Sequence, residues 1–206
     1  MLLLKNIPIE FSRKDILSYL GFKPRKSQIN PMVDSLVEEA IDAARLVIKP
    51  AVVIHTLMTE KVLPERIVFR DSDFNITGGK IVEFMSLCTR VSFIGATIGW
   101  DIENEIRQLF DAQESSRAVV MDAVGSDAVE QAVSWADALL QREAQKEGFT
   151  TLRRVSPGYG LWNIEANATI AETVGAERIG IEVLPSYELL PRKSVIAAVG
   201  WVPRER

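Results

Sequence analysis

Residues 101–148 read DIENEIRQLFDAQESSRAVVMDAVGSDAVEQAVSWADALLQREAQKEG, and apolar side chains recur through this stretch at helical spacing. The first part carries one apolar stripe and the second part carries another. The stripes are Ile102, Ile106, Leu109 and Phe110, and then Val129, Ala132, Val133, Ala136 and Leu140. We expect two helices with a break near Ser115 or near Gly125, and Gly148 predicts the C-terminal end of the second.

Segments rich in β-branched residues flank this helical stretch on both sides. The predicted strands are residues 51–57, 66–70 and 90–97 before it, and 149–156, 178–185 and 193–202 after it. The remaining predicted helices are residues 13–20, capped by Ser12, and residues 31–49, 81–87 and 163–174. This order lacks the regular strand–helix alternation of a doubly wound parallel sheet. We therefore predict a single α+β domain over residues 1–206, with a mainly antiparallel sheet and the long helices packed on it.

Composition and charge narrow the function classes. The net charge of −4 argues against a surface that binds nucleic acid or an acidic membrane. A single cysteine, Cys88, excludes an internal disulfide, and we interpret it as a buried apolar residue. A single histidine, His55, excludes multi-histidine metal sites and argues against a Ser-His-Asp triad. Neither a signal-peptide pattern nor a charge-free apolar window of membrane-spanning length is present, so we expect a cytoplasmic protein without a bound metal.

Residues 153–162, RRVSPGYGLW, carry the clearest binding chemistry in the chain. An arginine suits a carboxylate because its planar guanidinium can donate two parallel hydrogen bonds. Gly158 allows a close backbone approach or a positive φ, and Tyr159 and Trp162 supply flat apolar faces. Together they suit a small ligand with a carboxylate and an aromatic ring. The alternative is a type I or type II turn that carries a surface arginine.

Two further features of the sequence could belong to a binding site or could be purely structural. Residues 95–101, GATIGWD, place a glycine pair between a strand and a helix, as a phosphate-binding loop does. The spacing matches neither the dinucleotide fingerprint nor the P-loop, so close strand–helix packing is the better interpretation. Glu130 follows Val129 beside the buried helical stripe, so we single out this acid for a possible place in a site.

Read together with LLPRKSVIAAVG (residues 189–200), the RVSPGYG segment resembles the reactivation domain of cobalamin-dependent methionine synthase in its small free-standing form. That family carries an Arg-x-x-x-Gly-Tyr motif, matched here by Arg154, Gly158 and Tyr159. It also carries a Pro-Arg-Lys-Ser-Val segment, matched by residues 191–195. Weaker similarities lie in residues 15–23, 95–107 and 128–133, so the resemblance extends over nearly the whole chain.

The resemblance implies a binding site for S-adenosylmethionine. Arg154 would hold the methionine carboxylate, and the backbone of Val155 and Ser156, with Gly158 in the same turn, would meet the adenosyl part. Tyr159 would face the corrin ring of a docked cobalamin domain and is the residue assigned to the catalytic step.

Acidic residues complete the implied site, which suits a ligand that carries a positive sulfonium. Glu130 would lie by the ligand, so we expect its side chain to face the same cavity as the Arg154 loop. An acid near the N-terminus would bind the amino group of the ligand. Glu10 is the best match for this acid, and Asp15 is its competitor.

The implied chemistry is the rescue of an inactive cob(II)alamin by reductive methylation. The methyl group would come from S-adenosylmethionine, and the electron from flavodoxin or ferredoxin. The chain has no folate, homocysteine or cobalamin module, so it would act in trans as an accessory component of a cobalamin-dependent methyltransferase, with methionine synthase the favoured partner. The alternative is a module of the same fold that docks a corrinoid protein without binding S-adenosylmethionine productively. An unrelated hydrolase or methyltransferase has little support, because the sequence has no nucleophile elbow and no glycine-rich loop after its first strand.

Overall fold

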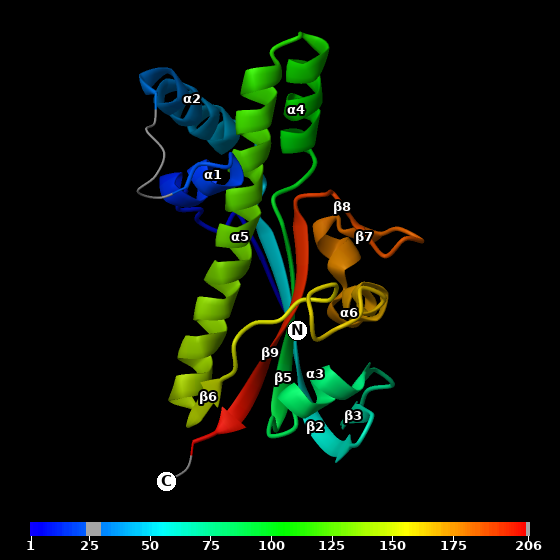
Figure 1. Cartoon of the computed structure of the whole chain (residues 1–206). Coiled ribbons are helices and arrows are strands. Elements are labelled where there is room, and N and C mark those ends of the chain that lie inside the picture. The colour runs from blue at the N-terminus through cyan, green and yellow to red at the C-terminus, as the bar shows by residue number, and fades with distance from the viewer. Residues whose placement is uncertain (24–29, 205–206) are drawn as a thin grey trace.

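The computed structural model describes residues 1–23 and 30–204, and within them the main sheet has seven strands. Their order is β4-β3-β2-β5-β9-β6, with β1 paired to the first part of β2, and every pairing is antiparallel (Figure 1). The strands are β1 (Leu2–Lys5), β2 (Ala51–Leu63), β3 (Arg66–Phe69), β4 (Asn75–Thr77), β5 (Arg90–Thr97), β6 (Phe149–Thr151) and β9 (Ser194–Pro203). The α+β class with an antiparallel sheet is therefore confirmed.

Helices cover both faces of this sheet. One face carries α1 (Arg13–Tyr19), α2 (Pro31–Val47) and the long helix α5 (Ser115–Lys146), and α4 (Asp101–Asp111) packs on α5. The other face carries α3 (Gly79–Phe84), α6 (Ala166–Val174), the 3₁₀ turn η1 (Ala176–Ile179) and a two-stranded sheet of β7 (Glu182–Val183) and β8 (Leu189–Leu190). Figure 1 shows α5 along one side of the strands, with α3 and α6 on the other side.

The central strands feed two separate cores, because neighbouring residues of a strand point to opposite faces. In β2, Val52 and Ile54 join the core beneath α5, and Val53 joins the core beneath α6. Strand β5 divides in the same way between Ile94 and Phe93. Such strands are buried on both faces, and each large apolar side chain stabilises the fold by roughly 1.5–3 kcal/mol. This accounts for the nearly continuous apolar runs of β5 and β9.

The break in the helical stretch falls at residues 112–114, between α4 and α5, so of the two positions considered the one near Ser115 is right. Gly125 lies inside α5 and is buried against Lys193, whose Cε would be 3.2 Å from a Cβ at that position. The Lys193 Nζ pairs with Asp122 Oδ1 at 2.8 Å and donates to Ser126 Oγ at 2.8 Å. The glycine thus admits a lysine that ties the start of β9 to α5.

Two predicted strands are shorter than expected. Of residues 149–156 only Phe149–Thr151 form a continuous strand, β6, because the chain then bulges away from β9. Of residues 178–185 only β7 is a strand, since Gly175 and Gly180 both have positive φ and close the turn η1 between them. The strand predictions at residues 90–97 and 193–202 agree with β5 and β9.

The surroundings of the single histidine and the single cysteine indicate structural roles for both residues. His55 Nδ1 lies 3.0 Å from the carbonyl oxygen of Thr173, which joins β2 to α6. Cys88 is buried, and burial raises the pKa of its thiol to about 12, so it stays protonated at neutral pH. No helix in the described part of the chain has the length and apolar character needed to span a membrane.

Candidate functional site

A β-bulge places Arg154 beside the long helix. Thr151 is opposite Trp201 on β9, and the next pairing is Val155 with Ala198, so four steps along the first strand correspond to three along the second. One extra residue in this segment bends the chain and redirects its side chains. Arg153 turns to the α3 side, where its guanidinium lies 5.0 Å from the centre of the Phe84 ring. Arg154 instead reaches α5.

The guanidinium of Arg154 is paired with Glu130. Arg154 Nη2 donates to Glu130 Oε2 at 2.7 Å. The other terminal nitrogen, Nη1, is buried and has no hydrogen-bond partner among the described residues. An unpartnered charged donor in a desolvated place costs free energy. This nitrogen is therefore suited to donate a hydrogen bond to a further anionic or carbonyl group.

Asp137 lies two turns beyond Glu130 on the same face of α5 and also interacts with Arg154. Its Oδ2 accepts from Gln141, whereas its Oδ1 is buried without a partner in the part of the chain described. Burial raises the pKa of the Asp137 carboxyl, and the Arg154 charge partly offsets this. Arg154 therefore has two carboxylates of one helix in its surroundings.

The residues after Arg154 form a tight loop whose backbone bonds go partly to β9 and partly to the loop itself. The N–H of Val155 donates to Ala198 O at 3.0 Å, and Val155 O accepts from Ala198 N at 2.8 Å. Gly158 has φ +86°, a backbone conformation that residues with a Cβ rarely adopt. Its N–H donates to Trp162 O at 2.9 Å. Because the sheet already uses the backbone groups of Val155, Ser156 is better placed for a ligand contact.

A cavity of about 800 Å³ opens beside this loop. Its wall combines Glu130 from α5, residues 156–159, β8 and its neighbours, and residues 194–196 at the start of β9. Tyr159 is 78% exposed at this wall. Arg154 does not line the cavity itself, but it is paired with Glu130, which does. The volume lies within the range of sites for small molecules and cofactors.

Helix α1 brings a further acid and a tyrosine to the site. Asp127 on α5 is fully buried and its Oδ2 accepts the N–H of Ser12, the N-cap of α1, at 2.8 Å. Tyr19 at the end of α1 is 52% exposed; burial raises its pKa, and the nearby charges of Glu130, Asp127 and Asp15 raise it further. Asp15 therefore lies within electrostatic reach of Tyr19 and of Asp127.

The other candidate for the N-terminal acid, Glu10, has a different setting. Its side chain is exposed, and it is neither among the residues that line the cavity nor among the charges that act on Tyr19. Asp15 is thus the nearer of the two acids by its electrostatic contacts. Glu130 lies in the cavity of the Arg154 loop, where the sequence placed it, and the roles of all these residues toward a ligand stay predictions.

The acid that fixes α1 gives a pH-dependent stability. Burial raises the pKa of Asp127 above 3.8, although the Ser12 N–H and Gln131 partly offset the shift. The unfolded chain then loses this proton at lower pH than the folded chain, so the free energy of unfolding falls as the pH rises from 3.8 through the folded-state pKa. We expect Asp127→Asn to remove this fall, while exposed Asp42→Asn retains it. Urea unfolding from about pH 4 to about pH 7 measures the difference; parallel curves for wild type and Asp127→Asn would contradict the prediction.

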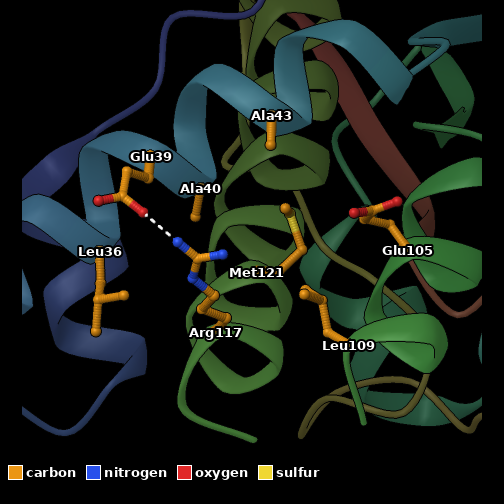
Figure 2. Close-up of a pocket in the computed structure, with 8 residues that line it drawn as sticks. All are labelled: Leu36, Glu39, Ala40, Ala43, Glu105, Leu109, Arg117 and Met121. Atoms are coloured by element: carbon orange, nitrogen blue, oxygen red, sulfur yellow. Dashed lines mark hydrogen bonds and ion pairs between the residues drawn. The ribbon is translucent and has the colours of Figure 1, made fainter. Parts of the chain in front are cut away.

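A second, smaller hollow of about 220 Å³ lies between α2, α4 and α5. Figure 2 shows Arg117 of α5 extended toward Glu39 of α2, with apolar side chains from all three helices around the pair. The two charges are 2.8 Å apart and about half exposed, and Glu114 also holds Arg117, at 3.1 Å. An exposed pair of this kind joins the helices weakly, typically with less than about 1 kcal/mol. We assign this hollow to helix packing.

Comparison with known proteins bears on the fold. The sequence matches no protein-family model and no curated protein. The structure has a fold already seen in a solved protein, in which an antiparallel sheet carries a long helix. One solved structure that it matches is the crystal structure of the MetH reactivation domain bound to AdoHcy, with a TM-score of 0.76 and 10% sequence identity. The match covers all of this chain and 80% of the other, and it confirms the fold expected from the sequence motifs.

Sequence reasoning missed Asp127, Asp137 and Tyr19. Asp127 and Asp137 carried a usable signal, because both are acids on a helix whose buried positions are almost all apolar, and Asp127 is itself one of those buried positions. Tyr19 carried none, since an aromatic residue at the end of a short helix reads as ordinary amphipathic packing. Lys193 was noted only within a motif, and its tie to α5 depends on contacts that the sequence does not reveal.

Proposed function

We propose that this protein binds S-adenosylmethionine in the cavity beside the Arg154 loop and acts in trans as a reactivation partner of a cobalamin-dependent methyltransferase. The observation that carries the proposal is the bulge that presents Arg154 to Glu130, at 2.7 Å, where Glu130 lines a cavity of about 800 Å³. The fold match to a domain solved with bound AdoHcy supports it. Methionine synthase is the first partner to test.

The residues present fit such a ligand. Arg154 supplies a guanidinium for a carboxylate, and Ser156 and Gly158 line the cavity. Glu130 and Asp15 supply the negative charge that a sulfonium and an ammonium require. S-adenosylmethionine would supply the methyl group, and a cobalamin on the partner would be its acceptor, with flavodoxin or ferredoxin as electron donor.

The protein's own part would be positioning and electrostatics. Tyr159 is 78% exposed at the cavity wall; it would contact a docked corrin ring, and we assign it to the transfer step. The chain would be an accessory component of the methyltransferase in the cytoplasm, and not a complete enzyme.

A second candidate function is a docking module of the same fold. Two observations favour it. The Arg154 guanidinium is already paired with Glu130 and does not line the cavity, and the Tyr159 side chain is exposed. Such a protein would dock a corrinoid protein without binding S-adenosylmethionine productively.

Calorimetric titration of the folded protein with S-adenosylmethionine and with AdoHcy separates the two functions. We expect saturable binding of both, and weaker binding of 5′-methylthioadenosine, which lacks the amino acid part. The companion assay measures methylcobalamin recovery by a methionine synthase without its own reactivation domain, with reduced flavodoxin present. No binding at millimolar ligand, together with capture of the cobalamin partner, would favour the docking module.

A further inference from the structure

Glu130 stands between Arg154 and the cavity. Its side chain lines the cavity wall and is 42% exposed, whereas the Arg154 side chain is 23% exposed and is not part of the lining. The pair is 2.7 Å apart, so the Glu130 carboxylate occupies the side of the guanidinium that faces the cavity. A carboxylate that enters from the cavity meets Glu130 before it can reach Arg154.

The backbone at Arg154 and a second nearby carboxylate do not depend on Glu130. Asp137 lies near enough for the Arg154 charge to act on it, and each of the two groups has one buried atom without a partner in the described ranges. The bulge fixes the backbone at Val155 through two hydrogen bonds to Ala198. The backbone that carries Arg154 therefore keeps its place when Glu130 leaves the guanidinium, and the Asp137 carboxyl remains nearby.

We propose that Glu130 is a specificity-determining residue: its carboxylate holds Arg154, and a ligand carboxylate binds only by displacing it. The proposal rests on the proposed function and adds a selection rule to it. A displaced Glu130 is left at the cavity wall without its partner, which is costly unless the ligand supplies a cation. The site therefore prefers ligands that carry an ammonium or sulfonium together with the carboxylate over ligands that carry a carboxylate alone.

The test compares two adenosyl ligands by calorimetry. AdoHcy carries both an ammonium and a carboxylate, and S-(5′-deoxyadenosin-5′-yl)-4-thiobutyrate is the same molecule without the ammonium. We expect wild type to prefer AdoHcy and Glu130→Gln to bind the thiobutyrate about tenfold more tightly than wild type does, so that the preference falls by a similar factor. Glu147→Gln is the matched control, because it removes the same charge from an ion pair with Arg90 that is outside the cavity. A preference that is unchanged in folded Glu130→Gln would overturn the inference.

A second readout needs no adenosyl ligand and separates this inference from the proposed function. Phenylglyoxal modifies guanidinium groups, and a paired carboxylate slows the reaction because it covers the nitrogens that the reagent attacks. Peptide mass spectrometry should show Arg154 labelled several-fold faster in Glu130→Gln than in wild type or Glu147→Gln. Equal labelling rates in Glu130→Gln and wild type would overturn the inference that the Glu130 carboxylate covers Arg154, even if the ligands bind. Faster labelling without any ligand binding would support that inference and would overturn the proposed function.

Discussion

Replacing Arg154 with alanine should weaken the binding of AdoHcy about ten- to a hundredfold while the fold survives. A charge-assisted hydrogen bond in a partly desolvated site contributes on the order of 1.5–3 kcal/mol, which corresponds to that range of affinity. The fold should survive because Arg154 is held by side-chain contacts to α5, and the bulge itself is fixed by the backbone bonds of Val155 to Ala198. Calorimetry with circular dichroism on the same samples measures both.

Two variants sharpen this experiment. Arg154→Lys should restore only part of the affinity, because an ammonium cannot reproduce the planar two-bond geometry of a guanidinium. Arg153→Ala is the control, since this neighbouring arginine points to the opposite side, over the Phe84 ring, and should leave the affinity within about twofold. Equal affinities of wild type and Arg154→Ala would mean that Arg154 is a structural residue on a turn.

The fold was largely predictable because its strongest elements depend on local pattern. The helical spacing of residues 101–148 and the apolar run of residues 90–97 each have one good solution, and both were found. The choice between Ser115 and Gly125 as the break could not be made locally, because Gly125 packs inside α5 against Lys193, which lies 68 residues further along the sequence.

The site was predictable only where a motif marked it. Arg154, Gly158 and Tyr159 belong to one short segment, whereas the setting of Asp127 depends on the docking of α1 against α5, 115 residues apart. The predicted strand over residues 149–156 was wrong after Thr151 for a similar reason. A one-residue bulge leaves no clear local signal in a β-branched stretch, yet it decides which way Arg154 points.

The largest effect on stability is expected at Gly200, in the middle of β9. A Cβ added there would lie 2.3 Å from Cys88 Sγ and 3.3 Å from Leu152 Cδ1. The distance to the sulfur is too short for any real contact, so the surrounding atoms would have to move. Overpacking of a buried site costs about 1–3 kcal/mol, and we expect Gly200→Ala at the upper end of that range, because the sulfur is buried and has little room to move. Urea unfolding measures the loss. Gly79→Ala is the matched control, since a Cβ there meets nothing within 4 Å.

A double-mutant cycle tests whether this contact is the cause. Cys88→Ala removes the sulfur, so the double variant Cys88→Ala with Gly200→Ala should be more stable than the sum of the single changes predicts, by about 1–2 kcal/mol. Strictly additive losses would mean that backbone effects in β9 are responsible. The cycle also bears on the site, because Gly200 O accepts the N–H of Leu152 at 2.8 Å at the beginning of the bulge that carries Arg154. Crowding at Gly200 should therefore weaken AdoHcy binding even where Gly200→Ala remains folded, and the double variant should recover that affinity together with the stability.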